Sequence, residues 1–270
     1  MQKPRIWAHM TVQEIREYLK ERPTAILPIG CTEQHGYHLP TNVDILNAEE
    51  MAKRVSAETG IAVLPTVNYT YSGGELPGTV NVSPNIIALY LEEICLSLAA
   101  QKVKNIILLL GHGGSENNQA IMAFRDLFLR KHRHLEVVLA VIPLFAMGDD
   151  GVLHMLCDNE TRKLYKPNDW HAGKTETSLM LYWEPDLVHM DRLTQDSKGM
   201  AELMRIDPDA YQDIQKPVDS PYVAPRAMQR KEIQVGVMGY PEEATAEIGE
   251  RMAQSGVKEL LKIIKNIERR

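Results

Sequence analysis

Two carboxylates and two imidazoles occur within twelve residues near the start of the chain, at Glu33, His35, His38 and Asp44. They directly follow an apolar run at residues 25–30, which is typical of a buried strand. Polar groups at such a place are costly unless they bind something. Carboxylate oxygens and imidazole nitrogens together suit divalent zinc, manganese or iron. The cluster therefore predicts a metal-dependent hydrolase.

The spacing within this cluster leaves two interpretations open. If the chain is extended here, Glu33 and His35 project to the same side and can face one ion; the alternative is a polar loop with a capping carboxylate. Asp44 lies just before a predicted helix that starts at Ile45, so it could cap that helix or bridge two metal ions.

A second candidate ligand, His112, lies among glycines at the end of the most apolar predicted strand, residues 103–110. Glycines allow close backbone approach and leave amide groups open to an anion. This setting favours a ligand role for His112 over a histidine buried in the core. Ser115 is expected to cap the helix that follows.

A third element places His171 and Glu176 on either side of a predicted helix start at Thr175. One interpretation is a proton-transferring histidine beside a metal-binding glutamate. The other is an ordinary helix start, where the dipole favours a carboxylate. Residue types alone do not separate the two.

The elements that must position these residues alternate along the chain. Strands are predicted at residues 25–29, 61–65, 103–110 and 135–143, and helices at residues 11–21, 44–56, 84–101, 116–132, 175–183 and 244–270. Such alternation predicts an α/β fold with a mostly parallel sheet covered on both faces. Residues 145–170 and 195–235 lack periodicity and are interpreted as insertions or oligomer contacts, so we expect one domain over residues 1–270.

The polar clusters all follow predicted strands, and ligands of parallel sheets bind beyond the carboxyl ends of the strands. The region around Glu33 follows the first strand, a glycine-rich loop follows the second, and His112 follows the third. We expect them to meet at one edge of the sheet. The residues of the glycine-rich loop expected to shape a substrate pocket are Ser72, Gly73, Gly74 and Glu75.

Composition excludes several classes of protein. The formal net charge of −6 offers no basic field for nucleic acid or an anionic membrane. Three cysteines without a CxxC pair argue for a reducing compartment and against a thiolate zinc site. The chain has no apolar run of the ~18 residues that a membrane span needs and no signal-peptide pattern. We therefore expect a soluble cytoplasmic enzyme.

Five motifs, in their order and spacing between about residues 24 and 255, resemble those of the creatininase (creatinine amidohydrolase) family. They are LPIGCTEQHGYHLPTNVD, ELPGT, LLLGHGGSENN, HAGKTETSLM and GVMGYPEEATAEIGERM. The resemblance implies a three-layer α/β/α sandwich with a two-metal centre at the carboxyl ends of the strands. It also implies hydrolysis of a cyclic or non-peptide amide, that is a C–N bond, and a homo-oligomer, a hexamer built as a trimer of dimers.

Carried over by position, the resemblance implies five metal ligands and one proton-transferring histidine. The ligands are Glu33, His35, the bridging Asp44, His112 and Glu176, and the histidine is His171. Together these residues would hold two divalent ions, zinc first, with manganese or iron as alternatives. Backbone amides of Gly113 and Gly114 would hold the developing oxyanion while His171 protonates the leaving group.

Two departures from the family pattern bear on the substrate. Lys174 stands where the family often has an acidic residue, and Gly114 stands where creatininase has a glutamate ligand, with Glu116 two residues further on. Creatinine is therefore not the leading small-molecule substrate. One alternative is a hydrolase that opens the ring of an oxidised inositol by cleaving a C–C bond. Another is a non-catalytic metal-binding partner in a maturation pathway. A Rossmann nucleotide binder is disfavoured, because residues 30–36 lack the glycine fingerprint and carry acidic charge.

Overall fold

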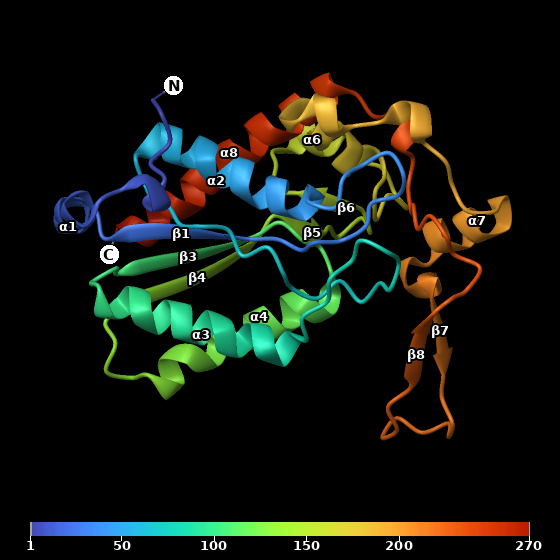
Figure 1. Ribbon diagram of the computed structural model, residues 1–270, viewed down its shortest axis with the longest axis horizontal. Helices are drawn as coiled ribbons and strands as arrows, with labels where there is room; N and C mark the ends of the chain where they lie inside the picture. Colours follow the sequence, from blue (N-terminus) through green and yellow to red (C-terminus); the bar gives the residue numbers. More distant parts are fainter. Residues whose placement is uncertain (1, 270) are drawn as a thin grey trace.

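A parallel sheet forms the centre of the molecule, whose computed structural model describes residues 2–269. Its strand order is β2-β1-β3-β4, and all neighbours pair in parallel (Figure 1). The strands are β1 (Thr24–Ile29), β2 (Ala62–Val63), β3 (Asn105–Leu110) and β4 (Val138–Pro143). All four predicted strands are present, although the second is only two residues long.

Helices cover both faces of this sheet, as Figure 1 shows. The upper layer contains α2 (Val43–Thr59), α6 (Lys174–Trp183) and α8 (Ala246–Glu268), and the lower layer contains α3 (Pro84–Ala100) and α4 (Ser115–Lys131). Helix α1 (Val12–Glu21) lies at one end of the sheet. The predicted three-layer α/β/α fold is confirmed, and the described residues include no helix with the length and apolar composition that crossing a bilayer requires.

Strand β3 shows why the sequence specifies a sheet with two covered faces. Ile107 and Leu109 belong to the core under α2, α6 and α8, whereas Ile106, Leu108 and Leu110 belong to the core against α3 and α4. All five side chains are buried. Alternate residues of a strand point to opposite faces, so a strand covered on both sides needs an uninterrupted apolar run.

Local signals explain several helix ends. Thr11 and Glu14 form a capping box at the start of α1. Pro84 opens α3, where its missing N–H would have no partner in any case. Helix α2 stops at Gly60, whose φ of 76° is readily adopted only by glycine.

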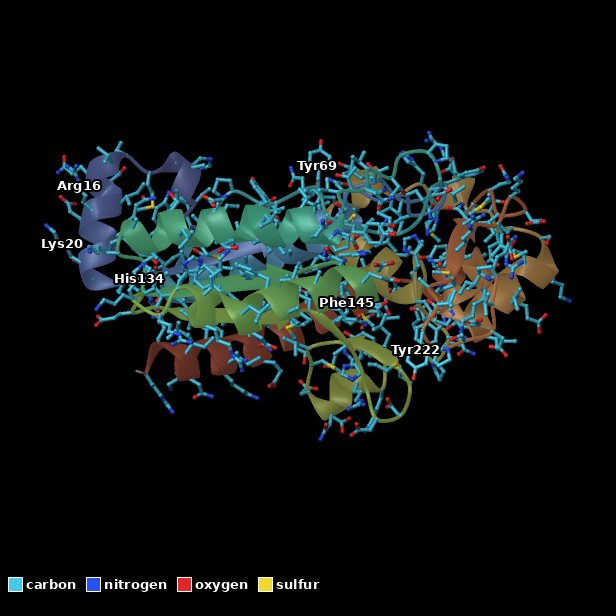
Figure 2. The ribbon with its side chains drawn as sticks, turned by 90° about the horizontal axis from the view of Figure 1, so that it is seen from below. Arg16, Lys20, Tyr69, His134, Phe145 and Tyr222 are labelled. Carbon is cyan, nitrogen blue, oxygen red and sulfur yellow. The ribbon has the colours of Figure 1, made fainter. Side chains whose placement is uncertain are left out.

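The segments without periodicity fold into short elements rather than open loops. They include two antiparallel hairpins, β5 with β6 and β7 with β8. The second hairpin projects from the body as an arm (Figure 1), and Tyr222 between its strands is almost fully exposed (Figure 2). The short strands and helices are β5 (Phe145–Met147), β6 (Leu153–Met155), α5 (Asn159–Arg162), α7 (Lys198–Ile206), β7 (Gln212–Gln215) and β8 (Arg226–Gln229). The 3-10 helices are η1 (Trp7–His9), η2 (Pro185–Leu187), η3 (Met190–Arg192), η4 (Pro208–Tyr211) and η5 (Pro241–Glu243).

The first turn of α2 is pressed against the carboxyl ends of β1 and β3. A Cβ atom on Gly30 would lie 2.5 Å from the Cα of Ile45, and one on Gly111 would lie 2.1 Å from the carbonyl oxygen of Asp44. Only glycine permits this approach. The helix starts at Val43 with Asn42 as its N-cap, so the interpretation of Asp44 as a capping residue is wrong. Asp44 lies one position inside the helix and is brought to the sheet edge.

Candidate metal centre and active site

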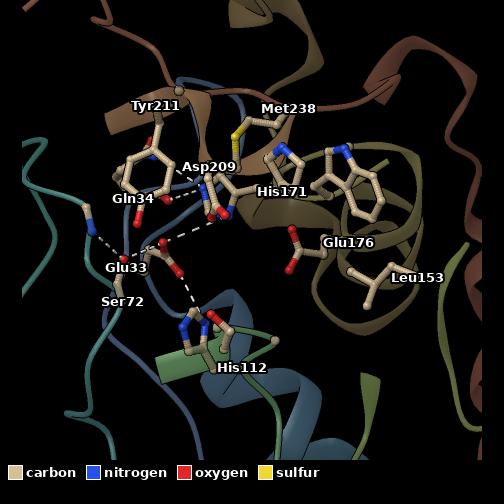
Figure 3. Close-up of a pocket in the computed structure, with 18 of the residues that line it drawn as sticks. Glu33, Gln34, Ser72, His112, Leu153, His171, Glu176, Asp209, Tyr211 and Met238 are labelled. Carbon is tan, nitrogen blue, oxygen red and sulfur yellow. Dashed lines mark hydrogen bonds and ion pairs between the residues drawn. The ribbon is translucent and has the colours of Figure 1, made fainter. Parts of the chain in front are cut away.

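Five polar side chains from four segments converge at the carboxyl edge of the sheet, and Figure 3 shows part of this group. The loop after β1 supplies Glu33 and His35, α2 supplies Asp44, the loop after β3 supplies His112, and the first turn of α6 supplies Glu176. These are the five predicted metal ligands, and the fold places them in contact.

The five residues form two triads that share Asp44. In the first, Nδ1 of His112 lies 2.9 Å from Oδ2 of Asp44 and 3.2 Å from Oε2 of Glu33. In the second, Nε2 of His35 lies 3.6 Å from Oδ1 of Asp44 and 3.5 Å from Oε1 of Glu176. Within each triad the candidate ligand atoms lie within 4.8 Å of one another. This arrangement can hold two cations joined by one carboxylate.

Several buried atoms in these triads have no hydrogen-bond partner. His35 and Asp44 are 0% and 1% exposed, so water does not satisfy them. Such orphaned groups are costly unless a cation binds them. The atoms concerned that face the triads are Glu33 Oε2, His35 Nε2, and Asp44 Oδ1 and Oδ2. Their oxygen and nitrogen donors fit divalent zinc, manganese or iron.

The electrostatics of the centre also call for positive charge. Burial opposes ionisation of Glu33, but His171 and His112 hold the pKa of its carboxyl well below its usual range. Burial also opposes a charge on the two imidazoles, yet Glu176 and Asp44 hold the pKa of His35 well above its usual range. Asp44 and Glu33 do the same for the pKa of His112. Divalent cations would supply the charge that protons on the imidazoles otherwise provide.

His171 lies beside the second triad. Its ring centroid is 4.3 Å from that of His35, and its Nδ1 is 4.0 Å from Oε1 of Glu33. On the other edge of the ring, Nε2 lies 2.8 Å from the carbonyl oxygen of Gln34. The predicted proton-transferring histidine is therefore next to the centre with its Nδ1 edge toward it.

A buried aspartate fixes the helix that carries Glu176. Asp169 accepts hydrogen bonds from the backbone N–H groups of Lys174 and Thr175 at the start of α6, and from that of Tyr240. Glu176 itself accepts one from the N–H of Ala172 at 2.6 Å. Glu176 supports the helix start with one oxygen and faces His35 with the other, so the helix-start interpretation applies and the second oxygen is available to a metal ion.

The glycine-rich loop contributes only some of the predicted pocket residues. Ser72 donates a hydrogen bond of 2.5 Å to Oε1 of Glu33, so it orients a candidate ligand. Ser72 and Gly74 line the cavity described below, whereas Gly73 and Glu75 do not. The amide groups of Gly73 and Glu75 are bound elsewhere, to Asn81 and Gln229.

In the loop after β3, the backbone at Gly114 passes close to the imidazole of His112. A Cβ atom on Gly114 would lie 2.3 Å from Nε2 of His112, so glycine is needed where the loop passes the imidazole. Gly113 and Gly114 both line the cavity. Gly114, not Ser115, is the N-cap of α4, so the interpretation of Ser115 as the cap is wrong; its hydroxyl donates to Glu116 instead. Glu116 lies at the cavity wall outside both triads.

His38 lies in the core behind the centre and belongs to neither triad. Its Nε2 lies 3.0 Å from the hydroxyl oxygen of Thr177. Burial, together with the nearby His35 and His171, lowers the pKa of His38 to about 4. It therefore packs beside the centre as a neutral imidazole.

A cavity of about 340 Å³ opens onto the two triads. Glu33, His112, His171 and Glu176 line its inner end. The rest of its wall comes largely from segments whose role the sequence did not indicate. These residues are Gln34 in the first motif, Phe145, Met147 and Leu153 in the β5–β6 hairpin, and Tyr211, Gln229 and Met238 further along. Gln34 lies between two predicted ligands and Met238 lies in the last of the five motifs, whereas the other residues named here had no signal in the sequence.

The family profile described as creatininase, creatinine amidohydrolase, matches residues 8–264. The chain belongs to the creatininase family. It is 32% identical over 184 residues to the creatinine amidohydrolase of Pseudomonas putida, covering 62% of this chain and 67% of that protein. The predicted family and its assignment as a hydrolytic enzyme are confirmed.

Two other relatives of this creatininase-family chain have different names. It is 30% identical over 240 residues to the mycofactocin precursor peptide peptidase of Mycolicibacterium smegmatis, covering 85% of this chain and 79% of that protein. It is also 30% identical over 190 residues to the 3-dehydro-scyllo-inosose hydrolase of Thermotoga maritima, covering 67% and 57% of the two chains. The family thus includes proteins named for quite different substrates.

Solved structures agree with the fold. A mutant creatininase superposes with a TM-score of 0.75 at 25% identity, covering 98% of both chains. A manganese form of creatininase gives a TM-score of 0.76 at 24% identity, again with 98% of each chain covered.

Proposed function

We propose that this chain hydrolyses a C–N bond of a cyclic or otherwise non-peptide amide in a small molecule. Two divalent metal ions would be held by Glu33, His35, Asp44, His112 and Glu176. The observation that carries the proposal is the shared position of Asp44, whose two buried oxygens face different triads. A carboxylate shared between two sets of ligands can hold two ions close together, as two-metal hydrolytic sites do. Zinc suits the donors best, and manganese or iron are alternatives.

The bound ions would lower the pKa of a water molecule and polarise the substrate carbonyl. The chain's own residues would supply the remaining chemistry. Nδ1 of His171 faces the centre and would pass a proton to the leaving nitrogen. Glu176 would act in catalysis through its place beside His35. The backbone amides of Gly113 and Gly114, at the cavity wall, would stabilise the developing oxyanion.

The lining of the cavity supports a small substrate without strong negative charge. Its volume of about 340 Å³ suits a small molecule. Among the described residues that line it, none is a lysine or an arginine, so away from the metal centre no cationic side chain is placed to pair with a substrate carboxylate or phosphate. Phe145, Met147 and Leu153 give one apolar wall, while Ser72 and Gln229 offer hydrogen-bonding groups.

A second candidate is cleavage of a C–C bond in an oxidised inositol. The relative named 3-dehydro-scyllo-inosose hydrolase favours it. Polar groups of Ser115, Tyr211 and Gln229 at the cavity wall could contact the hydroxyls of a cyclic polyol. A role as a metal-binding maturation partner without turnover would be supported by full metal occupancy and no hydrolysis.

The deciding experiment is a substrate panel with the metal restored. The purified chain is stripped of metal, reloaded with zinc or manganese, and assayed with lactams, formamides and cyclic diketones. We expect hydrolysis of at least one cyclic amide that disappears on metal removal. Turnover of the diketones alone would support the C–C hydrolase instead, and metal-independent amide cleavage would contradict both proposals.

A further inference from the structure

The ring of His171 is held from one edge by a single residue. Its Nε2 lies 2.8 Å from the backbone carbonyl oxygen of Gln34 and 3.2 Å from the side-chain nitrogen of the same residue. Its Nδ1 lies on the opposite edge, 4.0 Å from Oε1 of Glu33. Gln34 therefore contacts the edge of the imidazole that faces away from the centre (Figure 3).

The side chain of Gln34 is itself fixed in one orientation. Its Oε1 accepts a hydrogen bond of 2.9 Å from the N–H of Gly36, so its amide nitrogen must face His171. Its backbone N–H donates to the hydroxyl of Thr79. The amide end has no freedom to turn away without losing these contacts.

Space for this amide is provided by a glycine in the left-handed backbone conformation. A Cβ atom on Gly236 would lie 2.6 Å from Nε2 of Gln34, and the φ of Gly236 is 75°. Asp196 holds that backbone by accepting hydrogen bonds from the N–H groups of Val235 and Gly236. Gly236 and Asp196 thus support the approach of Gln34 to His171.

The same segment fixes the backbone of His171. The N–H of His171 donates to the carbonyl of Met238, and the N–H of Met238 donates to the carbonyl of His171 at 2.8 Å. The remaining freedom of His171 is rotation of its side chain. The contacts that oppose this rotation are those of Gln34 at Nε2 and the packing of the ring on His35.

We infer that Gln34 is a positioning residue that keeps Nδ1 of His171 turned toward the carboxylate cluster and the cavity. The inference rests on the proposed role of His171 in proton transfer. The backbone carbonyl of Gln34 accepts when Nε2 carries a hydrogen, and the side-chain amide of Gln34 donates when it does not, so this nitrogen has a partner in either state. The ring need not turn to satisfy Nε2, and Nδ1 stays aligned for the substrate.

A double-mutant cycle tests whether Gln34 acts through His171. The variants are Gln34→Leu, His171→Ala and the two combined, each reloaded with zinc in the full chain. We expect Gln34→Leu to lower kcat by about 10-fold or more, with unchanged KM and metal content, because only alignment is lost. In the His171→Ala background the same change should alter kcat by less than about twofold.

Gln229 supplies a matched control, because it lines the same cavity without any hydrogen bond to His171. Gln229→Leu should change KM more than kcat, and its effect should add to that of His171→Ala. An effect of Gln34→Leu that appears in KM, or that adds fully to His171→Ala, would show that Gln34 only contacts substrate or only supports the fold. If Gln34→Leu does not fold, Gln34→Met replaces it.

A spectroscopic measurement separates this inference from the proposed function. Histidine nitrogens are labelled with ¹⁵N in zinc-loaded protein, and the signals of His171 are identified by their loss in His171→Ala. We expect one sharp set of ring signals in the unchanged protein. Gln34→Leu keeps the backbone carbonyl of residue 34 but loses the side-chain amide, and should give broadened or mixed signals. Identical His171 signals in both proteins would overturn the inference. The His171 signals could differ between the unchanged protein and Gln34→Leu even when the protein turns over no compound in the substrate panel. That result would support Gln34 as the group that holds the ring and would refute only the proposed function.

Discussion

Asp44 is the side chain common to both triads, because its two oxygens face imidazoles of different triads. Oδ2 lies 2.9 Å from Nδ1 of His112, and Oδ1 lies 3.6 Å from Nε2 of His35. In an ordinary helix N-cap, one carboxylate oxygen would accept a hydrogen bond from a backbone N–H. Asp44 makes no such bond, and both oxygens remain available to ligands.

At the same scale, Gly114 controls the position of His112. Gly114→Ala would put a Cβ atom 2.3 Å from Nε2 of His112, so the imidazole must shift from the position in which its Nδ1 faces Asp44 and Glu33. We expect metal affinity to fall by about 10- to 100-fold, the usual cost of disturbing the support of a ligand. Competition with a fluorescent zinc chelator measures the change.

Gly199→Ala is the matched control for that substitution. No atom lies within 4 Å of the Cβ position at Gly199 in α7. It should bind metal like the unchanged protein. Equal metal affinity of Gly114→Ala and Gly199→Ala would contradict the placement of His112 as a ligand.

At the scale of elements, the contact of α2 with the sheet edge delivers Asp44 to the centre. Gly111→Ala would place a Cβ atom 2.1 Å from the carbonyl oxygen of Asp44 and 2.8 Å from the amide nitrogen of Ala48. Backbone atoms cannot move aside as a side chain can, so the first turn of α2 must shift. We expect the free energy of unfolding to fall by about 1–3 kcal/mol, measured by urea denaturation.

Metal content of Gly111→Ala gives a second result at this scale. Because Asp44 moves with α2, metal affinity should fall together with stability. A variant that is destabilised but binds metal normally would show that the position of α2 does not determine the centre.

The elements also show what the sequence could and could not predict. Apolar runs bounded by glycine or proline identified all four strands of the sheet, because a strand covered on both faces needs continuous apolar residues. Polar groups at the carboxyl ends of parallel strands converge, and this rule predicted that Glu33, His112 and the loop around Ser72 meet at one edge of the sheet. Glu176 was assigned as a ligand only by resemblance, because a helix start explains a glutamate equally well.

Other parts of the cavity depend on contacts that leave no local pattern. Tyr211 reaches the cavity from η4 and Gln229 from the end of β8, whereas Phe145 and Leu153 come from the β5–β6 hairpin. Hairpins of three or four residues per strand are too short for a reliable alternation. Their placement is set by packing against distant segments, so the sequence predicted only irregular insertions there.

At the scale of the whole molecule, the centre links stability to pH. Acidic neighbours raise the pKa values of His35 and His112. The stability that these protonated imidazoles contribute is therefore complete below about pH 6.5 and is lost as pH rises through the raised values. The lowered pKa values of Glu33 and Glu176 work in the opposite direction, since that contribution is present above about pH 4.5 and is lost on acidification. Metal-free protein should therefore lose thermal stability as the pH rises above about 6.5.

Melting curves of metal-free and zinc-loaded protein test this dependence. The loaded protein should melt at a higher temperature and lose less stability over the same alkaline range, because cations replace the imidazole protons. The same alkaline slope in both forms would contradict the account of the centre's electrostatics.

The predicted homo-oligomer also belongs to this scale. Helix α3 exposes Ile86, Leu89 and Tyr90 along one face, each at least half exposed. Such contiguous apolar surface is typical of an interaction site. We expect light scattering to give a mass that is a multiple of 30.5 kDa, with a hexamer as the specific prediction. A monomer at micromolar concentration would show that the resemblance does not extend to assembly.

The most direct test of the two-metal centre is the metal content of the purified, reloaded protein and of two ligand variants. Elemental analysis should find about two divalent ions per chain, as a shared carboxylate between two triads requires. His35→Ala and Asp44→Asn should lose metal and all turnover, whereas Glu116→Gln, at the cavity wall outside both triads, should retain both ions. Full metal content in the Asp44→Asn variant would contradict the account.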